Sequence, residues 1–199
     1  MKNFIKTLVL ICFLAVGNFA NAQKTTENVF LKVSGKVKTQ KLYEVQLVKT
    51  KPPKKKPNCL NYKCSNGSKT SFCNDDSDEN YVEFQELGYI EKTEIIVLNK
   101  FTYNEEFYVF LNKKNCNALT LGGFPLRIEH TNSFIVYNDP STDQRKTIQI
   151  LQMENGQLRP SGKIVFPEKI KLQKFLCLTL NEVYILDEKN QVWKTTIKK

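Results

Sequence analysis

Residues 107–115 read FYVFLNKKN, a short apolar run followed by a leucine and a polar turn that ends in asparagine. The same order recurs as IQILQMEN at 148–155 and as YILDEKN at 184–190. Each copy precedes another apolar position, so each predicts a β-hairpin whose asparagine tolerates left-handed backbone in the turn. The leucines of the three copies, Leu111, Leu151 and Leu186, are 40 and 35 residues apart. This spacing is close to the period of about 40 to 50 residues of propeller blades.

Short apolar runs with polar turns between them continue throughout the chain from Tyr81. They lie at 81–84, 95–98, 107–111, 134–137, 148–151, 176–180 and 183–186. None has sustained helical spacing, so we predict an all-β protein, either propeller-like or an open meander of antiparallel hairpins. Three units are fewer than the four blades of the smallest usual ring. Degenerate copies also arise in β proteins with Asn-rich turns, which leaves both a true repeat and an ordinary meander or sandwich open.

Three further stretches are GYI at 88–90, YVFL at 108–111 and LGGFP at 121–125. The last contains a Gly-x-Pro turn and is followed by the apolar run FIVY at 134–137. In these segments the chain resembles uncharacterised secreted bacterial proteins built from propeller-like β-repeats, over residues 81–199. The resemblance implies an exported β fold and supplies no catalytic residue.

The first 22 residues have the features of a secretory signal peptide. Lys2 and Lys6 precede an apolar stretch at 8–16, and Ala20-Asn21-Ala22 forms a small-residue cleavage site. A bilayer span needs about 20 apolar residues, which is longer than this stretch. We therefore expect cleavage after Ala22 and a secreted or periplasmic protein.

The residues before Tyr81 divide into two parts. Alternating apolar and polar residues at 29–38 and again at 43–47 predict two strands, which we expect to pair as an N-terminal β-hairpin within residues 23–50. Residues 51–80 are rich in lysine, proline and cysteine and are predicted to be an irregular loop or linker. The β-repeat domain is expected to occupy residues 81–199.

Five cysteines follow the signal peptide. Cys59, Cys64 and Cys73 lie within fifteen residues, and thiols that are close in an oxidising compartment tend to pair, so we predict at least one disulfide among these three. Their spacing lacks the paired C-x2-C or histidine pattern of a zinc site, and no metal or other cofactor is predicted. Cys177 lies in an apolar run and is expected to be a buried thiol.

The formal net charge of +10 is unevenly distributed, because residues 23–56 contain ten lysines and two glutamates. The candidate binding residues are lysines: Lys32, Lys36 and Lys38 on one strand face, then Lys49, Lys51, Lys54, Lys55 and Lys56 in a Pro-stiffened tract. Such a segment attracts anionic polysaccharide, lipid headgroups or another exported protein through point charges. A solvated face without a partner is the alternative interpretation.

The sequence offers little for catalysis. It has a single histidine, His130, between two predicted strands with no activated serine beside it, and lacks a phosphate loop, a dinucleotide fingerprint and a nucleophile elbow. The acidic residues at 75–79 lack the glycine of an EF-hand loop and are read as a solvated turn. Trp193 fits either a sugar-stacking platform or the core. We predict a non-enzymatic binding protein; the alternative is an exported hydrolase with unidentified catalytic residues.

Overall fold

The computed structural model describes residues 27–50, 57–138 and 146–198. In this part of the chain there are sixteen β-strands in antiparallel sheets and no α-helix, which confirms the prediction of an all-β protein and corresponds to an open meander. No helix in the described residues is long and apolar enough to cross a membrane.

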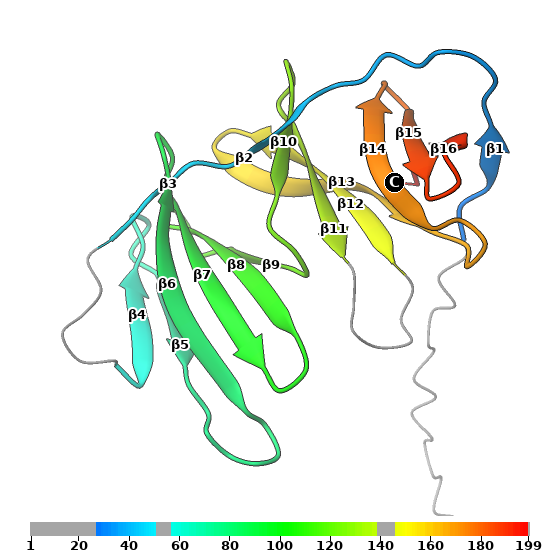
Figure 1. The fold of residues 1–199 in the computed structure, drawn as a ribbon. Helices are drawn as coiled ribbons and strands as arrows, with labels where there is room; N and C mark the ends of the chain where they lie inside the picture. Colours follow the sequence, from blue (N-terminus) through cyan, green and yellow to red (C-terminus); the bar gives the residue numbers. More distant parts are fainter. Residues whose placement is uncertain (1–26, 51–56, 139–145, 199) are drawn as a thin grey trace, which may run out of the picture.

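Three sheets follow one another along the chain, each built on an antiparallel meander (Figure 1). The first contains β6 (Val82–Ile90), β7 (Ile95–Thr102), β8 (Glu106–Asn112) and β9 (Ala118–Leu121). The second contains β10 (Leu126–Ile128), β11 (Ser133–Asn138), β12 (Thr147–Glu154) and β13 (Gln157–Val165). The third contains β14 (Leu172–Leu178), β15 (Glu182–Asp187) and β16 (Val192–Thr196). All the apolar runs predicted from Tyr81 onward lie wholly or partly in these strands.

The N-terminal segment adds one strand to each sheet. Its strands are β1 (Phe30–Lys32), β2 (Leu42–Glu44) and β3 (Leu47–Val48), which pair with β16, β10 and β6 respectively. We call residues 28–49 the strap, because they run past the third, second and first sheets in turn (Figure 1). The predicted N-terminal hairpin is therefore wrong: the two alternating segments contain three short strands, and each of the three pairs with a different sheet.

Two cores hold the three sheets together. Between the second and third sheets, Ile135 and Ile148 pack with Phe175, Val183 and other apolar side chains. Between the first and second sheets, the core includes Ile90, Ile95, Val97, Phe110, Leu121, Phe134, Val136, Leu151 and Leu158. These contacts bury apolar side chains on both faces of the second sheet, and burial of apolar area is the main stabilising term in such a stack.

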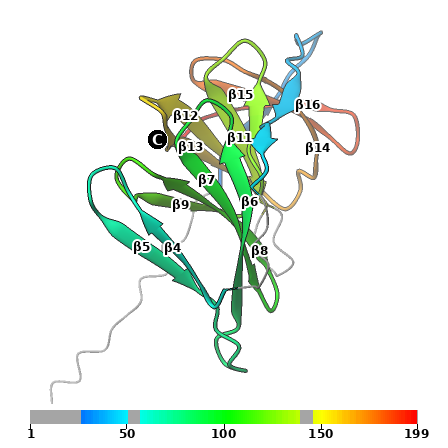
Figure 2. The ribbon, with the colours of Figure 1, turned by 90° about the vertical axis from the view of Figure 1, so that its left-hand side faces the viewer.

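The stretch predicted as an irregular loop contains a fourth, two-stranded sheet. β4 (Cys59–Lys63) and β5 (Lys69–Cys73) form a hairpin whose Leu60, Tyr62 and Phe72 cover the far face of the first sheet (Figure 2). The loop prediction is wrong for strands β4 and β5. Their few apolar residues stand at alternate positions, but the many lysines and asparagines around them make the stretch polar in average composition. Residues 51–56 lie outside the described residues.

Two disulfides fix this hairpin. Cys59–Cys73 closes its open end, which confirms the predicted local disulfide, and Cys64–Cys116 joins its turn to the β8–β9 connection. Cys116 was not anticipated as a partner. Cys177 is a buried free thiol, as predicted, and burial raises its pKa.

The three leucines of the sequence pattern do not occupy equivalent positions. Leu111 and Leu151 lie in the third meander strand of their sheets and are fully buried. Leu186 lies in the second strand of its sheet and is only half-buried, so the prediction of equivalence fails for the last copy. Asn155 and Asn190 adopt the expected left-handed backbone in their turns, whereas in the first copy Cys116 does so in place of Asn115.

Candidate functional site

A groove of about 1360 Å³ lies between strands β12 and β13 of the second sheet and the β14–β15 turn of the third. Amide and hydroxyl side chains contribute to its polar lining: Ser133, Gln149, Gln152, Ser161 and Asn181. Three aliphatic side chains supply its accessible apolar part: exposed Leu180 and partly buried Leu178 and Ile197. The groove therefore offers hydrogen-bonding groups beside apolar surface, which is the composition of sites that orient a ligand while burying its apolar parts.

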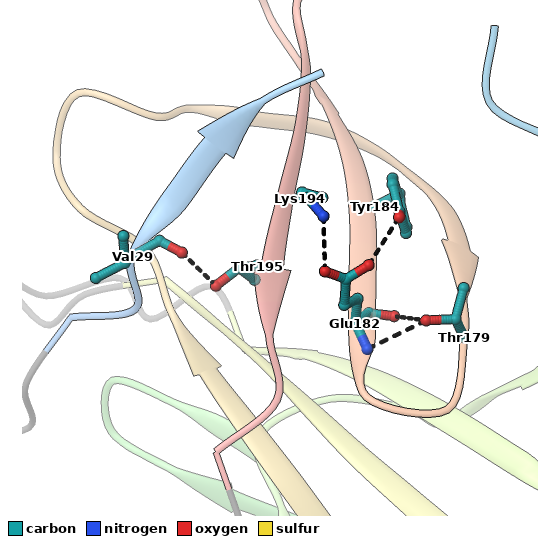
Figure 3. Close-up of polar contacts among 6 residues, drawn as sticks. All are labelled: Val29, Thr179, Glu182, Tyr184, Lys194 and Thr195. Carbon is teal, nitrogen blue, oxygen red and sulfur yellow. Dashed lines mark hydrogen bonds and ion pairs between the residues drawn. The ribbon is translucent and has the colours of Figure 1, made fainter. Parts of the chain in front are cut away.

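Leu180 is at the tip of the β14–β15 turn and is 92% exposed. The turn is held by Thr179, whose hydroxyl donates to the carbonyl of Glu182 and accepts from the Glu182 N–H, both at 3.2 Å (Figure 3). The backbone carbonyl of the neighbouring Asn181 accepts from the N–H of Ile197 at 2.9 Å. An exposed leucine is thus presented on a turn with fixed geometry.

Glu182 connects this turn to the outer face of the third sheet. Its Oε1 lies 2.8 Å from Nζ of Lys194, and its Oε2 accepts from the hydroxyl of Tyr184 at 2.8 Å (Figure 3). The hydrogen bond from Lys194, followed by that from Tyr184, lowers the pKa of Glu182, and the same pair raises the pKa of Lys194. Both side chains are therefore charged at neutral pH.

The predicted binding lysines do not form one patch. Lys32 ends β1, Lys36 and Lys38 lie in the strap between β1 and β2, and Lys49 follows β3 beside the first sheet. The shared strand face predicted for the first three is wrong, because β1 ends at Lys32 and Gly35 bends the chain with a φ of 111°. All four are exposed, and none makes an ion pair with another described residue. Lys51, Lys54, Lys55 and Lys56 lie outside the described residues.

The polar residues considered for catalysis or metal binding lie in turns or form contacts that hold the fold together. His130 lies in the β10–β11 turn with its side chain 91% exposed, and its Nε2 is 3.8 Å from Oε1 of Glu129. Glu129 itself fastens the strap, since it accepts from the hydroxyl of Tyr43 at 3.0 Å and the N–H of Lys41 at 3.2 Å. Asp75 accepts from the N–H of Ser77, as in a polar turn. Among the described residues no group of histidine, cysteine, aspartate and glutamate could hold a metal ion.

Sequence reasoning missed the groove because its walls come from separate strands. Leu180 was counted as the end of the apolar run at 176–180, but β14 ends at Leu178 and Leu180 belongs to the turn. The signal available was a leucine followed at once by Asn181, a residue type favoured in turns. Nothing local indicated that strands β12 and β13 would face this turn.

Comparison of the chain with protein-family models, with curated proteins and with solved structures finds no match.

Proposed function

We propose that this chain is an exported binding protein without catalytic activity, and that its groove takes an extended segment of another exported protein. The observation that carries the proposal is the groove itself, with exposed Leu180 held on a hydrogen-bonded turn at its rim. A protruding leucine that is already fixed in position loses little conformational freedom when it is covered by a ligand.

The chemistry of the lining favours a peptide over a glycan. Extended peptides need donors and acceptors for their backbone and apolar contacts for some side chains, and the groove offers both. Binding sites for sugars rely on aromatic rings, which present flat apolar surface with a polar edge. The described residues that line the groove include no aromatic side chain. Trp193 lies elsewhere, with its indole N–H donating to Asp187 at 2.8 Å.

The compartment follows from the cysteines and the leader. Two disulfides among the described residues are typical of an oxidising environment such as the periplasm or the cell exterior. The signal-peptide features of residues 1–22 agree with this location, and we place the start of the mature chain at Gln23.

The direct test is binding of the mature chain to a peptide array and to a glycan array. We expect peptides with spaced apolar residues to bind and the variant Leu180→Glu to lose this binding. Tyr103→Glu is the matched control, because it places the same charge on an exposed residue in the first sheet. Binding to glycans alone, or binding unaffected by Leu180→Glu, would overturn the assignment of the groove. Turnover of any substrate in a parallel hydrolase panel would favour the alternative of an exported hydrolase.

A second candidate function is attachment of the strap to an anionic surface. The supporting observation is that Lys32, Lys36, Lys38 and Lys49 are exposed and make no ion pair with the described residues. Exposed lysines spaced along one extended segment suit a long polyanion or a membrane of anionic lipids better than a compact ligand.

The resemblance to secreted proteins with propeller-like β-repeats stays a prediction about the fold. It is supported by three successive antiparallel meanders and by β1, which becomes the fourth strand of the third sheet. The unequal positions of the three leucines argue against a strict repeat.

A further inference from the structure

The outer face of the third sheet is built from rows of residues that lie opposite one another on neighbouring strands. One row contains Leu31, Lys194 and Tyr184 and ends at the buried Cys177, as their pairing shows. A second contains Val33, whose N–H donates to the carbonyl of Val192, followed by Leu186 and Lys174. Residues directly opposite in antiparallel strands share a face. The alternate residues, Phe175, Val183 and Ile185, point into the core shared with the second sheet.

This outer face is apolar at the β1 edge. Val29 is 77% exposed and Leu31 is 57% exposed, and both belong to the strap next to β16. Half-buried Val33, Val192 and Leu186 continue the apolar surface, and none of them belongs to a core cluster of the described residues. Several apolar side chains gathered on one uncovered sheet face mark an interaction surface.

The two ends of the three-sheet stack differ. At the opposite end, the outer face of the first sheet carries Ile96, Leu98, Val109 and Leu111, and hairpin β4–β5 covers it. No described element covers the outer face of the third sheet (Figure 1). Because hairpin β4–β5 covers only the first sheet, the outer face of the third sheet is available to a partner.

We propose that this face binds the same face of a second copy of the chain. Glu182 and Lys194 both lie on it, 2.8 Å apart, so it carries one negative and one positive group and is electrostatically complementary to itself. A two-fold axis that runs between these two groups in the plane of the interface would place Lys194 of one copy opposite Glu182 of the other, as in an isologous dimer. A purely anionic or cationic partner would leave one of these two charges facing a like charge.

The expected dimer is weak. Strands lie about 4.8 Å apart, so four strands give a face on the order of 15 Å across. A face of this size is at the small end of specific interfaces, where association is weak and transient.

The test is sedimentation velocity of the mature chain across a concentration series from the low micromolar to the millimolar range. We expect a monomer–dimer equilibrium that Leu31→Glu weakens at least tenfold. Tyr103→Glu is the matched control, since Tyr103 is 58% exposed at a distant turn of the first sheet, and it should leave the equilibrium unchanged. A monomeric wild-type chain at every concentration, or equal effects of the two variants with the fold intact by circular dichroism, would overturn the proposal.

Two charge reversals separate contact between copies from a role within one copy. Glu182→Lys and Lys194→Glu should each dimerise poorly alone, whereas an equimolar mixture should form heterodimers, because the two altered faces then carry opposite charges. If the mixture associates no better than either variant alone, the face does not pair with its own copy. A stable complex of the wild-type monomer with a different protein through Leu31 would equally contradict a homodimer.

Discussion

Asp187 is a buried carboxylate at the end of β15 that organises the last turn of the molecule. Its Oδ1 accepts from the N–H groups of Lys189 and Gln191 at 2.9 and 2.8 Å, and its Oδ2 accepts from Nε1 of Trp193 at 2.8 Å. Burial opposes ionisation, but these donors outweigh it and hold the pKa of Asp187 below its usual value of 3.8. Asp187 therefore links the β15–β16 turn to the indole ring of Trp193, which packs against the core.

Asp187→Asn should lower the free energy of unfolding by about 1–3 kcal/mol, because an amide cannot accept from all three donors and one buried polar group loses its partner. The effect should depend on pH. A lowered pKa in the folded state adds stability that is present above the unfolded value of 3.8 and is lost as pH falls through the folded pKa. The variant should therefore approach wild type in strong acid. Urea unfolding followed by the fluorescence of the single tryptophan, at neutral and acid pH, measures this.

The control for this residue is Glu188→Gln, which changes an exposed neighbouring carboxylate. A loss of stability equal to that of Asp187→Asn would show that net charge, and not the buried hydrogen bonds, is responsible.

Individual residues differ in how far the sequence predicts them. Buried Cys177 and the left-handed Asn155 and Asn190 follow from residue type and immediate neighbours, and all three predictions are confirmed. The role of Asp187 does not follow, because its partner Trp193 is brought near only when β15 and β16 pair. For the same reason the sequence alone does not decide whether Trp193 is a core residue or a sugar-stacking platform.

Strands β8, β12 and β15 place the three pattern leucines in different surroundings, and this has an energetic consequence. Leu111→Ala and Leu151→Ala should each cost about 2–5 kcal/mol, because both side chains are fully buried and truncation leaves a cavity. Leu186→Ala should cost about 1 kcal/mol, since its side chain is only partly buried in the folded chain. Chemical unfolding of the three variants in dilute solution checks the order. Comparable losses at all three positions would restore the interpretation of equivalent repeats.

The two disulfides of hairpin β4–β5 should contribute unequally. Cys64–Cys116 spans 52 residues of sequence and Cys59–Cys73 spans 14. Because the entropy removed from the unfolded chain grows with loop length, replacing the first pair by alanine should cost about 4 kcal/mol and the second about 3. Thermal unfolding of the two double variants measures the difference. The opposite order would mean that hairpin β4–β5 depends more on its own closure than on its attachment to the β8–β9 connection.

At the level of elements, the sequence predicts strands better than their partners. Alternation and short apolar runs are local, so the strand segments after Tyr81 and the two alternating segments of the strap could be recognised. Pairing is non-local: β1 joins β16 and β2 joins β10, contacts between distant parts of the chain that no spacing rule indicates. Cys116 was missed as the partner of Cys64 for the same reason.

At the scale of the described molecule, the strap contacts all three sheets. It supplies an edge strand to each, and Asn28 bonds to the second sheet through its backbone and side chain at Val165. The strap lysines are consequently distributed over the length of the stack. Replacing them should therefore remove separate point charges and not one compact patch.

Replacing Lys32, Lys36, Lys38 and Lys49 with glutamine should lower the salt concentration at which the mature chain elutes from heparin. Each lysine should contribute additively, because the four are separated along the strap and act as independent point charges. The matched control replaces four exposed lysines elsewhere, Lys63, Lys69, Lys171 and Lys189, which removes the same charge. An equal shift in both variants would mean that heparin responds to net charge and that the strap is a solvated face.

The candidate site belongs to this largest scale, and the sequence could not predict it. Its walls come from β12, β13, the β14–β15 turn and the C-terminal residues 197–198, which meet only after the second and third sheets pack. The lysine segment was the more visible feature in the sequence because its charge is contiguous along the chain.

Hydrogen exchange of the mature chain, with and without the peptide that binds best on the array, tests the central claim most directly. If the groove is the binding site, the peptide should slow exchange in segments 149–154, 160–165 and 178–182, and leave hairpin β4–β5 and the strap unchanged. Slowed exchange confined to the first sheet or to the strap, with no change at the β14–β15 turn, would contradict the assignment of the groove.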